Sequence, residues 1–240
     1  TLAYSYAMPI LNQGNHKTIK GEKYGWKTYG IHLSPNTVSG YKVCYDATQG
    51  CIDACLDTAG RGAMPSVQTA RTNKTKRFFE DRSGFLTDLW KEVASAIKSA
   101  TRKDLKFCMR PNLTSDLPWE SIFFKGKSLM RTFNPCRFYD YTKSLKRFTR
   151  FLNGELPENY HLTFSRSEET TDQLVIALCK SGGNVAVVFR DHLPDKYLGI
   201  DVLDGDDNDL RFLDTTGCIV GLVEKGLAKK DQTGFVVEPC

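Results

Sequence analysis

The sequence predicts a single α/β domain built on a parallel β-sheet covered by helices. Helical and strand patterns alternate from Ser66 onward, and the strand-like segments are nearly continuous apolar runs. No linker or internal repeat divides the 240 residues. Right-handed crossovers leave an open doubly wound sheet or a barrel, and we expect a parallel-strand partial or complete (β/α) barrel spanning residues 1–240.

The first quarter of the chain has little regular patterning. Residues 1–28 form an irregular lead-in, since the first 30 residues lack helical periodicity and contain four glycines. The segment YGIHLSP, residues 29–35, predicts a first strand that ends at Pro35. A cysteine-containing loop over residues 36–65 follows.

The rest of the chain alternates between helix and strand. A polar helix begins at Ser66, and a second begins near Gly84, where apolar residues recur every three or four positions up to Ala100. Strands are predicted at 105–110, 137–142, 160–165 and 184–190, and helices at 119–124, 128–133, 144–154 and 170–183. Short strands close the chain at 197–205, 210–214, 219–226 and 234–239.

Composition excludes several protein classes. Hydrophobic residues make up 40% and charged residues 25%, which is ordinary globular usage and excludes a disordered or fibrous chain. The longest apolar run, residues 174–179, is far shorter than the roughly 18 residues of a membrane helix. No basic and then apolar leader opens the chain. We therefore expect a soluble cytoplasmic protein with no membrane contact.

The net charge of +5 is unevenly distributed along the chain. Residues 71–150 contain 19 Lys or Arg against 8 Asp or Glu, whereas the remainder is acidic. Such a span suggests a face that binds DNA, RNA or another phosphate-bearing partner. The alternative is that these cations occupy the solvated sides of helices.

Three of the eight cysteines lie close together in the sequence. Cys44, Cys51 and Cys55 have the spacing Cx6Cx3C and supply three soft ligands, which suits zinc or an iron–sulfur cluster. The fourth ligand would be His32, Cys240, a distant cysteine or an open position for substrate. The alternative is three ordinary reduced thiols, since the spacing matches no zinc-ribbon pair.

Polar residues follow each predicted strand, where parallel α/β folds place their chemistry. Asp116 is the best candidate acid or base, although it or Ser115 would equally suit the N-cap of a helix near Pro118. The candidate catalytic residues are Asp116, Ser115, Asn112 and Tyr141. The candidate substrate-binding residues are Arg110, Lys143, Ser165, Ser167 and Arg190.

Other motifs carry less information. The stretch DGDDND, residues 204–209, lacks the glycine and the final glutamate of an EF-hand loop, so it predicts a polar turn. The four histidines are scattered, and GxxxxGK[ST], GxGxxG and GxSxG are all absent. Nucleotide-hydrolysing, Rossmann and serine-hydrolase classes are therefore disfavoured.

Six segments together resemble a known family. They are CYDATQGCIDACLDTAGRG, RPNLTSDLPWE, RFYDYTKS, NYHLTFSRSEE, NVAVVFR and GFVV, in this order over residues 28–237. In this combination the chain resembles the uncharacterised phage and plasmid proteins of the gene-product-eighty-eight family. The resemblance implies a phage or mobile-element origin and a role inside the host cell. The residues whose importance it implies are Cys44, Cys51, Cys55, Arg110, Asn112, Ser115, Asp116, Tyr141, Lys143, Ser165 and Ser167.

A looser architectural similarity links the chain to radical-SAM enzymes, whose cysteine cluster also follows the first strand of a partial barrel. Their CxxxCxxC motif is absent and only Cys51-x3-Cys55 survives of it, so SAM is not expected as a cofactor.

Two functions follow from these observations. The first is a metal-dependent α/β-barrel enzyme acting on a nucleic acid, nucleotide or other phosphate-bearing substrate. The cysteine triplet would hold the metal, Asp116 would act as acid or base, and Arg110 and Lys143 would bind the anionic group. The alternative is a non-enzymatic module that binds nucleic acid or a host protein, in which the cysteines only staple a loop.

Overall fold

The computed structural model describes residues 9–13 and 18–239 and contains one large, mostly parallel sheet. Ten strands belong to it, in the order β1-β2-β3-β6-β7-β8-β11-β10-β9, with β12 paired to β8. All pairs are parallel except β1–β2 and β9–β10. The prediction of a parallel α/β sheet is therefore confirmed.

The described strands do not close into a barrel. β1 (Asn12–Gln13) pairs with β2 and β9 (Lys196–Tyr197) pairs with β10, and no ladder among the described residues joins these two edges. The closed form of the predicted barrel is therefore wrong for this part of the chain. Strands β2, β3, β6, β7 and β8 nevertheless follow one another in sequence order, unlike the reversed order of a doubly wound sheet.

The central strands are β2 (Trp26–Gly30), β3 (Lys106–Arg110), β6 (Arg137–Thr142), β7 (Tyr160–Ser165) and β8 (Val185–Phe189). β10 (Ile200–Asp204), β11 (Ile219–Val223) and β12 (Val236–Val237) complete the sheet. A separate hairpin joins β4 (Phe123–Phe124) to β5 (Lys127–Ser128).

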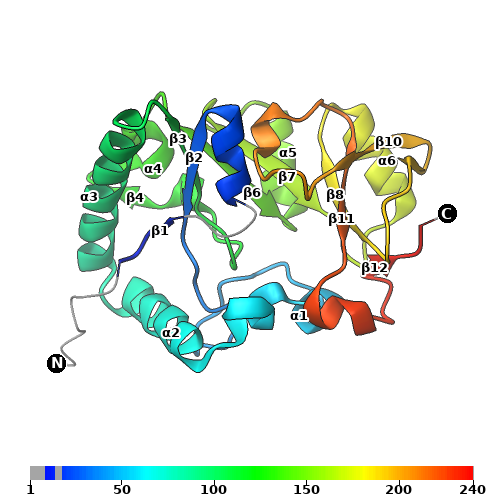
Figure 1. Ribbon diagram of the computed structural model, residues 1–240, viewed down its shortest axis with the longest axis horizontal. Helices are drawn as coiled ribbons and strands as arrows, with labels where there is room; N and C mark the ends of the chain where they lie inside the picture. Colours follow the sequence, from blue (N-terminus) through cyan, green and yellow to red (C-terminus); the bar gives the residue numbers. More distant parts are fainter. Residues whose placement is uncertain (1–8, 14–17, 240) are drawn as a thin grey trace.

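Four helices lie on one face of the sheet (Figure 1): α3 (Arg82–Thr101), α4 (Leu129–Thr132), α5 (Leu145–Leu152) and α6 (Asp172–Lys180). The predicted apolar stripe of α3 is confirmed, because Leu86, Leu89 and Val93 are all buried. They belong to the main core with Phe107 and Phe138 from the facing side of the sheet. None of the described helices is long and apolar enough to cross a membrane.

The opposite face of the sheet is covered by irregular segments. Cys108 and Tyr139, which alternate with the core residues of their strands, pack against Leu210 and Phe212. These belong to the segment around the 3-10 helix η5 (Arg211–Leu213), and η1 (Thr18–Tyr24) lies beside β2. The DGDDND segment, which precedes η5, also contacts η1: Lys23 and Tyr24 both donate to the Asp207 carboxylate, at 2.9 and 2.7 Å.

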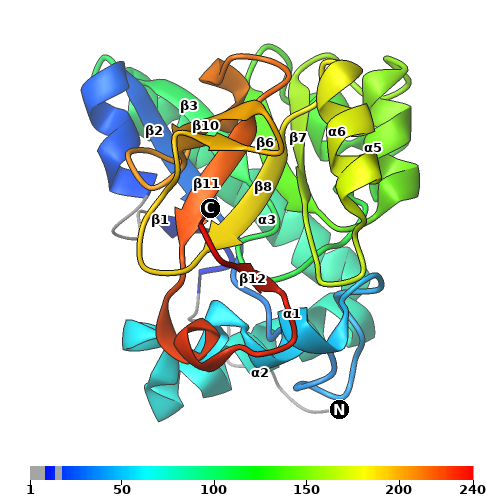
Figure 2. The same ribbon diagram turned by 90° about the vertical axis from the view of Figure 1, so that its right-hand side faces the viewer.

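The carboxyl ends of the strands are covered by a third layer (Figure 2). It contains α1 (Gln49–Asp53), η2 (Leu56–Thr58), η3 (Gly60–Ala63) and α2 (Pro65–Glu80), together with η6 (Gly226–Lys230) near the chain end. The loop predicted at 36–65 is therefore partly helical, and it lies across the edge where chemistry was expected.

Three element predictions are wrong. The strand predicted at 29–35 corresponds to β2, which begins at Trp26, inside the predicted irregular lead-in, and ends at Gly30 instead of Pro35; β1 also lies within that lead-in. Residues 119–124 form η4 (Trp119–Ser121) and β4 instead of a helix. Residues 210–214 form η5 instead of a strand, because this segment packs its side chains onto a sheet face and does not add to an edge.

Candidate functional site

A pocket of about 380 Å³ opens between α2 and the carboxyl end of β2, and we call it the β2-exit pocket. One wall is the face of α2, and the other is formed by the chain leaving β2 and by the loop after β3. Gly30 allows this close approach, since an added Cβ would lie 2.4 Å from Leu113 and 2.6 Å from the Arg110 carbonyl. The lining side chains used below are His32, Arg61, Ser66, Arg71 and Lys74.

Three of these side chains are cationic, and none of the described residues that line the pocket is acidic. The Lys74 ammonium is half-buried and donates to the Ile10 carbonyl at 2.8 Å and to Asn12 Oδ1 at 3.1 Å. Both partners are neutral, so burial lowers the pKa of Lys74 to about 8, although Glu92 nearby opposes the shift. An anion in the pocket would compensate this buried charge.

Arg71 is buried and bonds Asp57 in η2. Its Nη1 donates to the Asp57 carboxylate and to the Asp57 carbonyl. Gly62 makes room for this contact, because a Cβ there would lie 2.1 Å from the Asp57 carbonyl. The Nε atom of Arg71 is buried without a hydrogen-bond partner among the described residues, so part of the guanidinium remains unsatisfied.

His32 is a neutral group in this pocket. Burial lowers its pKa to about 3, and the charges of Arg71 and Lys74 add to the effect. Its Nδ1 atom is buried without a partner within the described residues. A neutral imidazole with an unsatisfied nitrogen is suited to a hydrogen bond with a ligand.

A second cluster lies farther along the same edge, around Lys143 at the end of β6. Its Nζ donates to Ser165 Oγ at 3.0 Å and to the Ser165 and Arg166 carbonyls at 3.3 and 3.1 Å. The ammonium lies 4.9 Å from the centre of the Phe235 ring. Burial lowers the pKa of Lys143, while the neighbouring Cys51 opposes the shift. The structure thus brings together Lys143, Ser165 and Cys51 from the predicted set.

Glu168 positions Cys51 in this cluster. Its carboxylate accepts from the Gly50 N–H and the Thr48 hydroxyl, both at 2.7 Å, at the start of α1. These bonds help to lower the pKa of Glu168 against the effect of burial. Burial raises the pKa of the Cys51 thiol, and the Lys143 ammonium opposes the shift.

The three cysteines are neighbours, and each is half-buried with a free thiol. Burial raises the pKa of Cys44 to about 12, and the charges of Asp116, Cys51 and Cys55 act in the same direction. Among residues 9–13 and 18–239, no group of three or more His, Cys, Asp or Glu side chains is arranged to hold a metal ion. Cys240, a candidate fourth ligand, lies outside the described residues. His32 lies in the β2-exit pocket.

Asp116 is held in an ion pair. One carboxylate oxygen accepts from Arg147, and the other accepts from the Lys143 N–H at 2.8 Å and the Thr142 hydroxyl at 3.1 Å. Burial raises its pKa, and the Arg147 guanidinium opposes the shift. The alternative N-cap role is wrong, because Pro118 caps η4 without a side-chain bond.

Asn112 and Ser115 shape the loop after β3. The Asn112 side-chain oxygen accepts from Ser115 Oγ at 2.7 Å, from the Leu117 N–H at 2.9 Å and from Trp119 Nε1 at 3.2 Å. Its amide and backbone N–H groups donate to the Asp140 carboxylate at 2.9 and 2.7 Å. Burial raises the pKa of this carboxyl to about 7.

The remaining predicted residues make other contacts. Arg110 points to the other sheet face, where it bonds Asp209 at 3.2 Å and stacks 4.5 Å from the Tyr141 ring centre. Ser167 bonds Thr170 before α6. Arg190 bonds Glu238 at 2.6 Å and the Asp231 carbonyl at 2.9 Å, which attaches the chain end to β8.

The sequence did not single out Arg71 and Lys74, which line the β2-exit pocket, and placed them only within the basic span. Their spacing on one face of the helix from Ser66, beside the small Ala70, was the available signal. The span itself is not one free basic face. Arg77, Arg147 and Arg150 form ion pairs with Asp88, Glu120 and Glu155.

Comparison with known protein families identifies this chain's family. A family model described as "Gene product 88" matches residues 9–239 and confirms the resemblance of the six segments. No curated protein and no solved structure matches the chain. The similarity to radical-SAM enzymes is thus without support from these comparisons.

Proposed function

Because the chain belongs to the gene product 88 family, whose description states no activity, we propose its function from its own residues: it binds a phosphate-bearing small molecule in the β2-exit pocket. The observation that carries the proposal is the charge of that pocket. Arg61, Arg71 and Lys74 line it together with the neutral His32, and no described lining residue is acidic.

The chemistry of these groups favours phosphate over other ligands. Guanidinium groups bind phosphate oxygens through paired N–H donors, and a lysine contributes a compact positive charge. Ser66 lies in the first turn of α2, where the helix dipole adds positive potential. The volume of about 380 Å³ falls within the range of roughly 300–1,000 Å³ that is usual for small-ligand sites.

Any catalytic group for this pocket would come from the cysteine-containing segment beside it. Burial raises the pKa of the Cys55 thiol, and the Asp57 backbone N–H and the Arg71 guanidinium only partly oppose the shift. Metal dependence through the cysteine triplet stays a prediction, as does binding of DNA or RNA by the basic span. Metal dependence is tested by measuring bound iron, zinc and sulfide in anaerobically purified wild type and in the Cys51→Ala/Cys55→Ala variant.

Binding of inorganic pyrophosphate and of adenosine monophosphate, measured by calorimetry, tests the proposal. We expect Arg61→Met and Lys74→Met each to weaken binding about tenfold, since each removes one charge–phosphate contact. Lys91→Met is the matched control, because Lys91 is an exposed lysine on α3 and pairs only weakly with Asp88 at 3.7 Å.

The pH profile gives a second readout. Affinity is expected to rise as phosphate loses its second proton near a pKa of about 6. It should fall again above pH 8, because Lys74 has a pKa of about 8 and loses its positive charge there. Lys74→Met should abolish this alkaline decline. Equal affinities in wild type, Arg61→Met and Lys74→Met, or no binding of either probe, would rule out the proposed function.

A further inference from the structure

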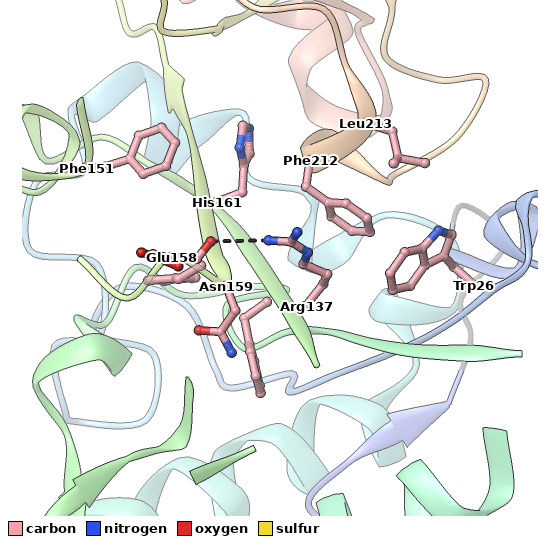
Figure 3. Close-up of a pocket in the computed structure, with 10 residues that line it drawn as sticks. Trp26, Arg137, Phe151, Glu158, Asn159, His161, Phe212 and Leu213 are labelled. Atoms are coloured by element: carbon pink, nitrogen blue, oxygen red, sulfur yellow. Dashed lines mark hydrogen bonds between the residues drawn. The ribbon is translucent and has the colours of Figure 1, made fainter. Parts of the chain in front are cut away.

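A second pocket, of about 240 Å³, lies at the amino ends of the strands, and we call it the amino-edge pocket (Figure 3). Trp26 and Arg137 are the first residues of β2 and β6, and His161 is the second residue of β7. Phe151 from α5 and Phe212 from η5 complete the set used here. The β2-exit pocket lies at the opposite ends of the strands, so the two pockets share no lining residue.

The walls of the amino-edge pocket are aromatic. Figure 3 shows His161 between Phe151 and Phe212, with Trp26 on the far side of Phe212. Trp26 and Phe212 meet edge to face at 4.9 Å, and so do Phe151 and His161 at 5.2 Å. All four rings are half-buried and remain partly accessible. Aromatic walls of this kind favour a planar ring, since nucleobases stack on aromatic side chains.

Arg137 and His161 are the polar lining residues used here; Glu158 and Asn159 also line the pocket. The Arg137 guanidinium is exposed, donates through Nη1 to the Glu158 carbonyl at 3.2 Å and lies beside Phe212 (Figure 3). The Nε2 atom of His161 is buried without a hydrogen-bond partner among the described residues. Burial lowers the pKa of His161 to about 4, and Arg211 and Arg137 add to the shift, so the imidazole is neutral.

These features define a ligand of a particular shape and polarity. An arginine can only donate hydrogen bonds, so the ligand must present acceptors to Arg137. A carbonyl oxygen beside a ring nitrogen matches two guanidinium N–H groups, as in the pairing of arginine with guanine. A volume of about 240 Å³ is below the roughly 300–1,000 Å³ of drug-sized sites, so it suits one ring system.

We propose that the amino-edge pocket binds a purine base that carries a carbonyl group, with its ring against the aromatic walls and its acceptor edge toward Arg137 and His161. This site is independent of the phosphate pocket. A planar base bound here occupies space between β2, β6, β7 and η5, so its binding also fixes η5 against the sheet.

The experiment titrates hypoxanthine into the full chain and follows binding by saturation-transfer NMR and by the His imidazole resonances. We expect millimolar or tighter binding, a shift of the His161 resonance, and adenine binding about tenfold more weakly because its exocyclic amine replaces the carbonyl acceptor. Arg137→Met should weaken hypoxanthine binding about tenfold. Arg131→Met, at an exposed arginine of α4, is the matched control and should bind normally.

Three further variants separate the possible outcomes. His161→Gln keeps a polar group and tests the imidazole, with the exposed His192→Gln as its control. Lys74→Met leaves hypoxanthine binding unchanged if the two pockets are independent. No hypoxanthine binding, equal affinity in Arg137→Met and wild type, or a resonance shift at His32 without one at His161 would overturn this proposal. None of these results bears on phosphate binding.

Discussion

Arg147 on α5 connects the segment after β3 to the first residue of β7. Its guanidinium is buried and makes a two-bond contact with Glu120, both at 2.9 Å, and a further bond to Asp116. It also donates to the Tyr160 hydroxyl at 3.0 Å. The negative charges around it raise its pKa against the opposing effect of burial. The loop after β3 is thereby attached to α5 through a single side chain.

Replacing Arg147 by Met should therefore destabilise the protein strongly. The change leaves Asp116 and Glu120 buried without their cation, which costs about 3–5 kcal/mol in the free energy of unfolding. Arg150→Met on the same helix removes only a solvent-exposed pair with Glu155 and should cost less than about 1 kcal/mol. Urea unfolding monitored by circular dichroism measures both values. Similar losses in the two variants would contradict the assignment of Arg147 as the central contact.

At the scale of single residues, the sequence predicted positions better than roles. Asp116 lies at a strand exit as expected, but its role as a buried ion-pair partner depends on Arg147, which is 31 residues away in the chain. Arg147 lies in the basic span 71–150, whose cations were expected to face solvent or a phosphate-bearing partner, but it is buried. Long-range pairing of this kind follows from the packing of elements and leaves no local pattern.

Helix α1 is short and is held in place by its neighbours. Glu168 bonds its first turn, and Cys51 packs against Ala54, Phe235 and Val236 of a small separate core. Gly50 permits the contact, because a Cβ there would lie 2.3 Å from Thr233 Oγ1 and 2.7 Å from the Glu168 carboxylate. The burial of Cys51 thus depends on a residue without a side chain.

Replacing Gly50 by Ala should push α1 away from Glu168 and Thr233. We expect a loss of about 1–3 kcal/mol from overpacking and a faster alkylation of Cys51 by iodoacetamide. Mass spectrometry of the labelled peptide measures the rate at Cys51. Gln49→Ala, at an exposed position of the same helix, should leave the rate unchanged. An unaltered rate in Gly50→Ala would show that this contact does not protect the thiol.

At the scale of elements, periodicity predicted the long helices and the buried strands. The stripe over 84–100 and the apolar runs at 137–142 and 160–165 all correspond to observed elements. Short segments were misassigned at 119–124 and 210–214, because a few apolar residues fit a strand, a helix or a 3-10 turn equally well. Tertiary packing decides between these forms.

Burial and strand pairing in the molecule are greatest in the middle of its sheet. β6 and β7 each have a paired strand on both sides and are almost fully buried, whereas β9 and β10 form a half-exposed edge. Local opening requires the loss of few contacts at such an edge and of many in the centre. The stability of individual backbone hydrogen bonds should therefore decrease from β7 toward β9.

Hydrogen–deuterium exchange of the intact chain tests this gradient. Amides of β6 and β7 should exchange roughly a hundredfold more slowly than those of β9 and β10. Peptide-resolved mass spectrometry at neutral pH provides the comparison, with the helical segment α3 as an internal reference of high burial. Equal protection of the centre and of this edge would contradict the expected gradient.

The position of β11 affects how the sheet assembles during translation. Within this sheet, β2, β3, β6, β7 and β8 each pair with the preceding strand of the sheet, although the separate β4–β5 hairpin is made between β3 and β6, so the sheet grows at one edge as the chain leaves the ribosome. β9 and β10 are synthesised next, but β11 separates β10 from β8 in the sheet. The β9–β10 hairpin therefore cannot pair with the sheet until β11 has been synthesised and has paired with β8. Because of this strand order, the sheet is completed only after the last fifth of the chain has been synthesised.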